Sequence, residues 1–203
     1  FRFPRYKAIE FKNIQIRGWI YGSSSILKIP FNWEFGSFSM IGSFVRGKNI
    51  TADKMNSGDI PVISAGLEPS GYHNNSNVKG PSITISASGA NAGYMSLHFS
   101  DIWAADCSYY QDKKWLWFAY SALKFLQPVI TNMQIGAAQP HVYPKNIDRL
   151  FIVIPDNKTL NDFNILVDPI FNDIKNLYQQ NKFLGNQRDL LLPRLMSGKL
   201  EVK

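Results

Sequence analysis

Apolar residues between Leu160 and Leu191 recur at alternating steps of three and four for more than four heptads. This spacing is typical of a coiled-coil seam, and polar residues at two of the a positions weaken such a seam while helping to fix its register. An amphipathic helix packed on its own domain would show the same periodicity, so both interpretations stay open. The predicted seam is Leu160, Phe163, Val167, Ile170, Ile174, Leu177, Asn181, Leu184, Arg188 and Leu191.

Pro169 interrupts this helical pattern. A proline inside a helix lacks a donor, and its ring crowds the carbonyl four residues earlier, here that of Ile165. Asp168 followed by Pro169 is also a favourable N-cap and first helical residue. We therefore expect a short helix to about Val167, a kink or break, and then a straight helix over Pro169–Leu191.

The ends of the helix and its length follow from the same pattern. Thr159, with Asp162 three residues later, predicts a capping box at the start. We expect Pro193 to end the helix. The straight part would be about 35 Å long, and a continuous helix from Thr159 about 50 Å. An apolar seam of this length needs a partner helix, and nothing upstream in the sequence supplies one.

Short β-type runs separated by turn residues dominate the chain between Trp33 and Lys145, with one clear helix predicted over Trp115–Leu126. The predicted fold class is α+β: a mixed, partly barrel-like β-sheet domain with few helices over residues 1–155, followed by a long C-terminal coiled-coil helix and tail over 156–203. The predicted strands are Ile41–Arg46, Ile60–Ser64, Ser82–Ser86, Gly93–Phe99, Ile102–Tyr110 and Leu150–Ile154.

The charge is unevenly distributed between these two parts. Residues 1–155 carry 15 Lys and Arg against 9 Asp and Glu, whereas residues 156–203 carry 7 against 6. The excess on the first part favours a polyanionic partner there. The apolar fraction of 45% is enough for a sizeable core and excludes a disordered chain.

Several classes of protein are disfavoured by the composition. Cys107 is the only cysteine, so an intrachain disulfide and a thiolate metal cluster are excluded, and the three histidines lack the spacing of a zinc site. No apolar run approaches the roughly 20 residues of a membrane span, and no signal peptide is recognisable. We expect a soluble cytoplasmic protein without a membrane partner. Because the chain begins with Phe1, we also expect either a fragment or missing first residues.

The search for catalytic motifs gives little. The glycine-rich stretch Gly89–Gly93 lies between two predicted strands and lacks the core of a nucleotide-binding fingerprint. A sequence motif of metal-dependent nucleases is approximated by Asp156, Asp173 and Lys175. However, Asp173 and Lys175 lie about 200° apart around the predicted helix and so cannot share a metal ion. There is no G-x-S-x-G motif, and only a dispersed Ser-His-Asp arrangement stays open. We predict a non-catalytic chain that binds no metal or cofactor.

Four polar, turn-rich loops are instead predicted to bind DNA. Asn and Gln can pair with adenine edges, Arg and Lys can pair with guanine or hold phosphate, and Ser can do either. For any single residue the alternative is an ordinary solvated turn. The candidate DNA-binding residues are Arg46, Lys48, Asn49, Tyr72, His73, Asn74, Asn75, Lys79, Ser86, Ser88, Asn91, Gln134, Gln139 and His141.

Several motifs, in the same order along the chain, resemble one family. They are Thr84–Gly93 followed by Ile102–Cys107, Gly136–Val142 leading into the strand that ends at Pro155, the ending Leu190–Leu200, and the opening Phe1–Pro4 with Trp33. Together they resemble the target recognition domain and spacer helix of type I restriction–modification specificity subunits. The resemblance covers nearly the whole chain. One departure is that a full subunit has two recognition domains and two helices, whereas this chain has one of each.

The resemblance implies a subunit that reads one half of a bipartite DNA site and docks the methyltransferase subunits. Paired spacer helices hold two recognition domains apart, so the partner helix would come from a second copy of the chain or from the other half of its own subunit. The predicted helix corresponds to roughly one to one and a half turns of duplex. Methyltransferase and motor-nuclease subunits would perform the chemistry on a flipped adenine, using S-adenosylmethionine, ATP and magnesium.

Two alternatives stay open from the sequence. One is the recognition region of a single-chain restriction–methylation enzyme, which would have catalytic motifs upstream. The other is a carbohydrate-binding or hydrolytic β-rich domain that uses Trp19, Trp103, Trp115 and Trp117. The apolar strand around Trp103 and the helix that begins near Trp115 favour core positions for these two tryptophans.

Overall fold

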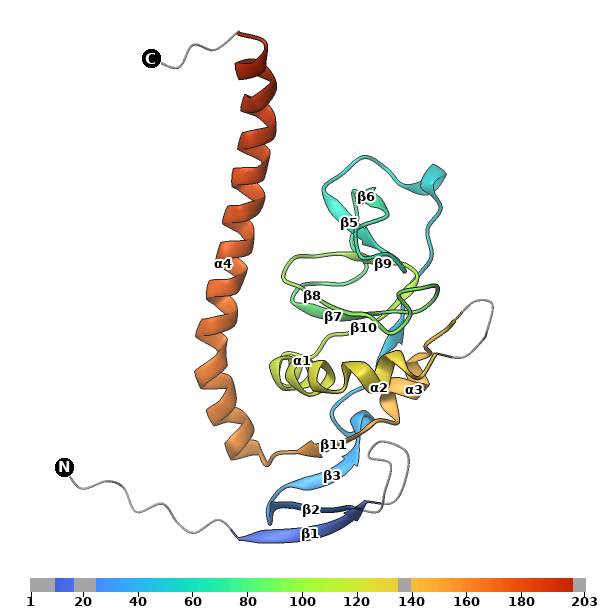
Figure 1. The fold of residues 1–203 in the computed structure, drawn as a ribbon, viewed down its shortest axis with the longest axis vertical. Helices are drawn as coiled ribbons and strands as arrows, with labels where there is room; N and C mark the ends of the chain where they lie inside the picture. Colours follow the sequence, from blue (N-terminus) through green and yellow to red (C-terminus); the bar gives the residue numbers. More distant parts are fainter. Residues whose placement is uncertain (1–9, 17–24, 135–139, 199–203) are drawn as a thin grey trace, which may run out of the picture. The chain divides into compact units, whose positions relative to one another are not determined.

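The computed structural model describes residues 10–16, 25–134 and 140–198 (Figure 1). The chain divides into two compact units, residues 1–160 and 161–203. The sequence-based division into 1–155 and 156–203 places the boundary five residues earlier. The expected opening motif at Phe1–Pro4 lies outside the described residues.

The main sheet of the first unit has four antiparallel strands in the order β4-β10-β7-β8. The prediction of β7 over Ser82–Ser86 is confirmed, and all five of its residues are buried. Alternating β-branched residues favour such a strand. The other three strands are β4 (Val45–Arg46), β8 (Met95–His98) and β10 (Cys107–Tyr110).

Three smaller sheets accompany it: β6-β5-β9, β11-β3 and β1-β2. Only β5 and β9 pair in parallel among these described strands. The sheets do not close into a barrel, so the mixed α+β class is confirmed with open sheets. Their strands are β1 (Phe11–Ile16), β2 (Ser25–Pro30), β3 (Glu34–Ser37), β5 (Ile60–Ile63), β6 (Gly71–His73), β9 (Trp103–Ala104) and β11 (Phe151–Ile154).

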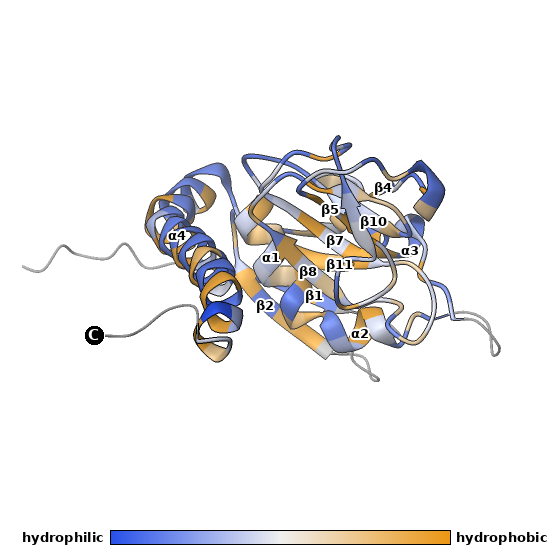
Figure 2. Cartoon of the chain, turned by 90° about the horizontal axis from the view of Figure 1, so that it is seen from above, coloured by the Kyte–Doolittle hydropathy of each residue, from blue (hydrophilic) through white to orange (hydrophobic). Residues whose placement is uncertain are grey.

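The predicted helix over Trp115–Leu126 is confirmed as α1 (Leu116–Phe125), which packs on the core of this unit. Its buried face packs in one cluster with Ile83 and Ile85 of β7. Figure 2 shows hydrophobic residues gathered on the strands in the middle of this unit. Four further short helices were not predicted: η1 (Phe38–Met40), η2 (Ala52–Lys54), α2 (Gln127–Thr131) and α3 (Pro144–Asp148). Proline in the first turn starts both α2 and α3.

Two of the predicted strands are wrong in extent. The run Ile41–Arg46 contributes only Val45–Arg46, because Gly42 adopts a φ of 136°, which is incompatible with a continuous strand. The run Ile102–Tyr110 is split into β9 and β10, which belong to different sheets. Periodicity shows where residues alternate, but it does not show where a strand leaves one sheet for another.

The helix α4 (Asn157–Met196) is continuous for 40 residues, with Pro169 and Pro193 inside it (Figure 1). Of the kink or break expected at Pro169, the break is wrong, and so is the expected end at Pro193. Ile165, whose carbonyl loses its partner to Pro169, is 70% exposed, so the penalty falls on a solvated stretch of helix. At 1.5 Å per residue the helix is about 60 Å long.

Asp156, and not Thr159, caps this helix. The N–H of Thr159 donates to Asp156 Oδ1 at 3.1 Å, and its hydroxyl donates to Asp156 Oδ2 at 2.8 Å. The two bonds lower the pKa of Asp156, the backbone N–H contributing most. The predicted N-cap, Thr159, therefore lies three residues after the observed one. Asp156, which the sequence analysis considered as part of a nuclease-like motif, serves as the N-cap.

Candidate nucleic-acid interface

Three of the four candidate loops of the first unit contact one segment, residues 101–107, which contains β9 and the start of β10. The remaining loop, around His141, is joined to one of these three. The sequence predicted this segment as part of a strand and assigned it no role in the site. In the structure it is the scaffold on which the loops are mounted.

The loop of Arg46, Lys48 and Asn49 lies directly on the scaffold. Arg46 Nη2 donates to Asp106 Oδ1 at 2.5 Å, the N–H of Lys48 donates to the carbonyl of Ala104 at 2.9 Å, and Trp103 Nε1 donates to the carbonyl of Lys48 at 2.8 Å. A Cβ at Gly47 would collide with the carbonyl oxygens of the scaffold, so glycine is required for this close approach. The side chains of the three candidate residues remain exposed.

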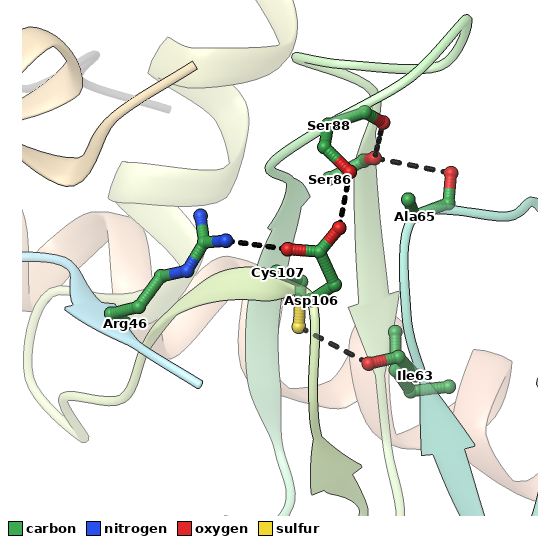
Figure 3. Close-up of polar contacts among 7 residues, drawn as sticks. All are labelled: Arg46, Ile63, Ala65, Ser86, Ser88, Asp106 and Cys107. Carbon is green, nitrogen blue, oxygen red and sulfur yellow. Dashed lines mark hydrogen bonds and ion pairs between the residues drawn. The ribbon is translucent and has the colours of Figure 1, made fainter. Parts of the chain in front are cut away.

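The loop after β7 meets the same carboxylate (Figure 3). The hydroxyl of Ser88 donates to Asp106 Oδ2, and the hydroxyl of Ser86 donates to the carbonyl of Ala65 at 3.1 Å. Ser86 and Ser88 are 5% and 7% exposed. Asn91, half-buried, lies in the turn that follows, where its carbonyl accepts the N–H of Tyr94.

The loop around His141 is joined to the loop after β7. His141 forms an isolated β-bridge with Ser88, and its ring stacks on that of Tyr143 at 6.0 Å. Gln134 Nε2 donates to the carbonyl of Ala92 at 2.9 Å. Gln139 lies outside the described residues.

The loop that continues from β6 contributes exposed side chains beside a buried histidine. His73 is 5% exposed, and its ring packs edge-on against that of Trp103 with 5.0 Å between the ring centroids. Its Nδ1 accepts the N–H of Asn56 at 3.0 Å. Tyr72, Asn74 and Asn75 are exposed. Lys79, the last candidate of this loop, donates to Asp101 Oδ2 at 2.6 Å, and this bond is the main cause of the lowered pKa of Asp101.

The structure therefore brings the loops together but divides the candidates by exposure. His73, Ser86 and Ser88 are buried and bonded inside the unit, so they are placed to support the surface, while their contact with DNA stays a prediction. The exposed candidates are Arg46, Lys48, Asn49, Tyr72, Asn74, Asn75 and Lys79.

Sequence reasoning missed the acidic and amide residues that hold the loops in place. Asp106 and Asp101 pair with Arg46 and Lys79, two of the three Arg and Lys candidates. Asn77 holds the backbone of Ala104 from both sides, with Nδ2 donating at 2.9 Å and Oδ1 accepting at 2.7 Å. Their only sequence signal was a polar residue beside an apolar run, because the partners are distant along the chain.

Burial shifts the pKa of two titratable groups of the first unit, Cys107 and His98. Burial raises the pKa of the Cys107 thiol to about 12, so the reactive thiolate is disfavoured. Burial also lowers the pKa of His98 to about 4, and its Nε2 lies 2.8 Å from Thr84 Oγ1. Within the described ranges no group of three or more His, Cys, Asp and Glu is arranged to hold a metal ion.

The predicted seam lies on α4, where Ile170, Leu177 and Leu184 are 57–59% exposed. Leu160 is the one seam residue that is buried, and it belongs to the first unit. Figure 2 shows hydrophobic and hydrophilic residues side by side along the helix. None of the described helices is long and apolar enough to cross a membrane.

Comparisons with known proteins agree on one family. The model of the type I restriction modification DNA specificity domain matches residues 30–186. The specificity subunit of the type I restriction enzyme MjaIX from Methanocaldococcus jannaschii is 36% identical over 87 residues, which are 43% of this chain and 20% of that protein.

Solved structures show the same fold. The S subunit of a type I restriction-modification system from M. genitalium has a TM-score of 0.62 at 20% identity, covering 82% of this chain and 46% of that one. The HsdS subunit from Thermoanaerobacter tengcongensis has a TM-score of 0.51 at 14% identity, covering 85% and 46%. The chain thus spans less than half the length of these relatives. With the family model matched over most of its residues, the chain belongs to the type I restriction modification DNA specificity domain family.

Proposed function

We propose that this chain is a sequence-specific DNA-binding component of a type I restriction–modification complex, and that its first unit reads one half of a bipartite site. The observation that carries the proposal is the assembly of the four polar loops around the segment 101–107, with the exposed cations Arg46 and Lys48 on one of them. Such a surface offers both phosphate-binding cations and amide groups that can pair with base edges.

The second unit is proposed to pair with another helix. The row of exposed apolar residues along α4 cannot be satisfied within the helix itself, and a paired coiled coil would bury it. The partner helix would belong to a second copy of the chain or to the other half of its own subunit. A helix of about 60 Å corresponds to between one and two turns of duplex, which suits a spacer between two half-sites.

In this proposal the chain is non-catalytic and docks methyltransferase and motor-nuclease subunits. S-adenosylmethionine, ATP and magnesium would belong to those partners. The names of the relatives support this assignment, since they are specificity subunits. The carbohydrate alternative gains nothing from the tryptophans: the indole of Trp103 is bonded to the backbone of Lys48, and Trp115 and Trp117 pack against the core.

Duplex binding and its salt dependence test the proposal. Neutralising phosphates releases counterions, so we expect the affinity for duplex DNA to fall steeply between about 50 and 200 mM salt. The variant Lys48→Ala should lower the slope of log K against log salt by about 1 unit, because a lysine that neutralises a phosphate contributes roughly one unit to the slope.

The matched control is Lys113→Ala, which removes one exposed lysine outside the loops. It should leave the slope nearly unchanged. Absence of duplex binding, or an equal decrease of the slope in the control variant, contradicts the assignment of this surface.

A further inference from the structure

Arg46 and Asp106 lie 60 residues apart in sequence and form an ion pair in the middle of the loop cluster (Figure 3). We propose that Arg46 reads a guanine in the target half-site, and that Asp106, anchored by Ser88, is a positioning residue that holds its guanidinium in the reading orientation. This inference rests on the proposed DNA-recognition function and names a specificity determinant within it.

Asp106 is fixed by three hydrogen bonds to two segments, the β4 strand with Arg46 and the loop after β7 with Ala87 and Ser88. Its Oδ1 accepts from Arg46 Nη2, its Oδ2 accepts from the hydroxyl of Ser88, and its carbonyl accepts the N–H of Ala87 at 3.3 Å. Ser88 is itself buried and held by the β-bridge to His141. The carboxylate therefore has a defined position before any ligand arrives.

Arg46 is held at one end only. Its side chain is 41% exposed, against 26% for Asp106, and it projects from β4, the edge strand of the main sheet. A guanidinium carries five N–H donors, and Asp106 takes one of them at Nη2. No other partner of this side chain is found among the described residues. The remaining donors are available to a ligand, and the bond to Asp106 restricts the orientations of the guanidinium.

The carboxylate favours a base edge over a phosphate as that ligand. A phosphate beside Asp106 would be repelled by the carboxylate, and the guanidinium that it approached would already be partly neutralised. The O6 and N7 atoms of guanine are neutral acceptors that match the planar fork of arginine. A guanidinium that is already oriented also loses less side-chain entropy on binding.

Stability of the fold does not explain this pair. Ion pairs with an exposed partner contribute little to folding, because water screens them and the long arginine side chain must be ordered. We infer instead that the buried Ser88 holds Asp106 in place so that Asp106 can orient the side chain of Arg46.

The test is selection of binding sites from a pool of random duplexes, using the full chain and its variants. We expect the wild-type chain to select a motif with one G·C pair that Arg46→Lys no longer prefers, with a loss of about 10-fold or more in discrimination at that position alone. Lysine keeps the charge but lacks the planar fork. Lys113→Ala, beyond the opposite end of β10, should leave the whole motif unchanged.

Asp106→Asn separates a positioning role from a merely structural one. It should weaken discrimination at the same G·C pair and at the same time raise affinity for non-specific duplex, because a negative charge is removed. Ser88→Ala should weaken the same discrimination to a smaller extent. If the role of Asp106 were merely structural, Asp106→Asn would instead lower the affinity for all duplexes and lower the melting temperature. That result would overturn the inference.

Failure of the inference and failure of the proposed function give different results. If the wild-type chain binds no duplex, both are wrong. If it binds and selects a motif whose every position survives Arg46→Lys, the DNA-recognition function stands and the role of Arg46 and Asp106 is wrong.

Discussion

In the first unit Ile83, Ile85 and Leu123 are fully buried between β7 and α1, whereas on α4 Ile170 and Leu177 are each more than half exposed. Both sets belong to strongly periodic segments, so periodicity alone does not separate them. The difference teaches that the first unit has a complete core of its own. The apolar row of the second unit is surface that a partner can bury.

The polar contacts of the two units differ in the same way. In the first unit Arg46 pairs with Asp106 and Phe44 N–H donates to Asp148, linking segments 60 and 104 residues apart. On α4 the ion pair between Arg188 and Asp189 joins neighbours in sequence. Distant contacts fix a tertiary structure, while neighbouring contacts leave a helix dependent on packing against something else.

The largest effect is expected from placing charge in the seam. Ile170→Glu with Leu177→Glu should raise the dissociation constant of the helix pair by about 1,000-fold, since each buried side chain of this size contributes about 2 kcal/mol. Light scattering of the intact chain, or of its complex with the other half of the subunit, measures this. Asn172→Glu with Gln179→Glu adds the same charge away from the seam and should leave association intact.

A core substitution should affect the other unit by a comparable but smaller amount. Ile85 is fully buried, so Ile85→Ala should destabilise the first unit by about 3 kcal/mol, and Ile85→Val by about 1 kcal/mol. Urea unfolding followed by tryptophan fluorescence reports on this unit. The comparison variant is Leu184→Ala on α4, which should leave the stability of the first unit unchanged. If Leu184→Ala destabilised the first unit as much as Ile85→Ala does, the distinction between a buried core and an exposed apolar row would be contradicted.

The sequence predicted those parts of the fold that depend on local pattern. Ser82–Ser86 and the helix near Leu116–Phe125 were placed correctly because alternation and helical spacing are read within a few residues. Pro169 misled the prediction because a local rule for proline was applied without the length of helix on both sides of it. The parallel pairing of β5 with β9 has no local signal at all.

The same limit applies to the candidate site. The polar loops could be found from their turn residues and their Arg, Lys and Asn side chains. That Asp106 joins Arg46 to Ser88, or that Asn77 holds Ala104, follows from tertiary structure alone. The burial of His73 beside Trp103 could not be predicted either, because the sequence does not distinguish an exposed histidine from a buried one.

The pH dependence of stability should distinguish the two units. His98 has its pKa lowered from 6.5 to about 4 by burial, so between these values the unfolded state binds a proton that the folded state does not. Stability of the first unit should therefore fall as the pH is lowered through this window, by up to about 3 kcal/mol, and be retained above it. Residues 156–203 contain no histidine, so helix pairing should lack this dependence.

Urea unfolding between pH 7 and pH 4 measures the effect. His98→Gln should flatten the pH profile. An unchanged profile in His98→Gln would show that another group is responsible.

The smallest effect is expected at Asp156, where the first unit leads into α4. Asp156→Ala removes the acceptor for Thr159 and should cost about 1 kcal/mol of helix stability, whereas Asp156→Asn, also a good N-cap, should cost only a fraction of that. Hydrogen exchange of the amides in the first turn of α4 measures the change. If the cap stabilises only the start of the helix, exchange accelerates there, while the melting of the first unit and the association of the seam stay as in the wild type. An accelerated exchange in β11 as well would show that the cap stabilises both units, and the two units would then be energetically coupled across the boundary.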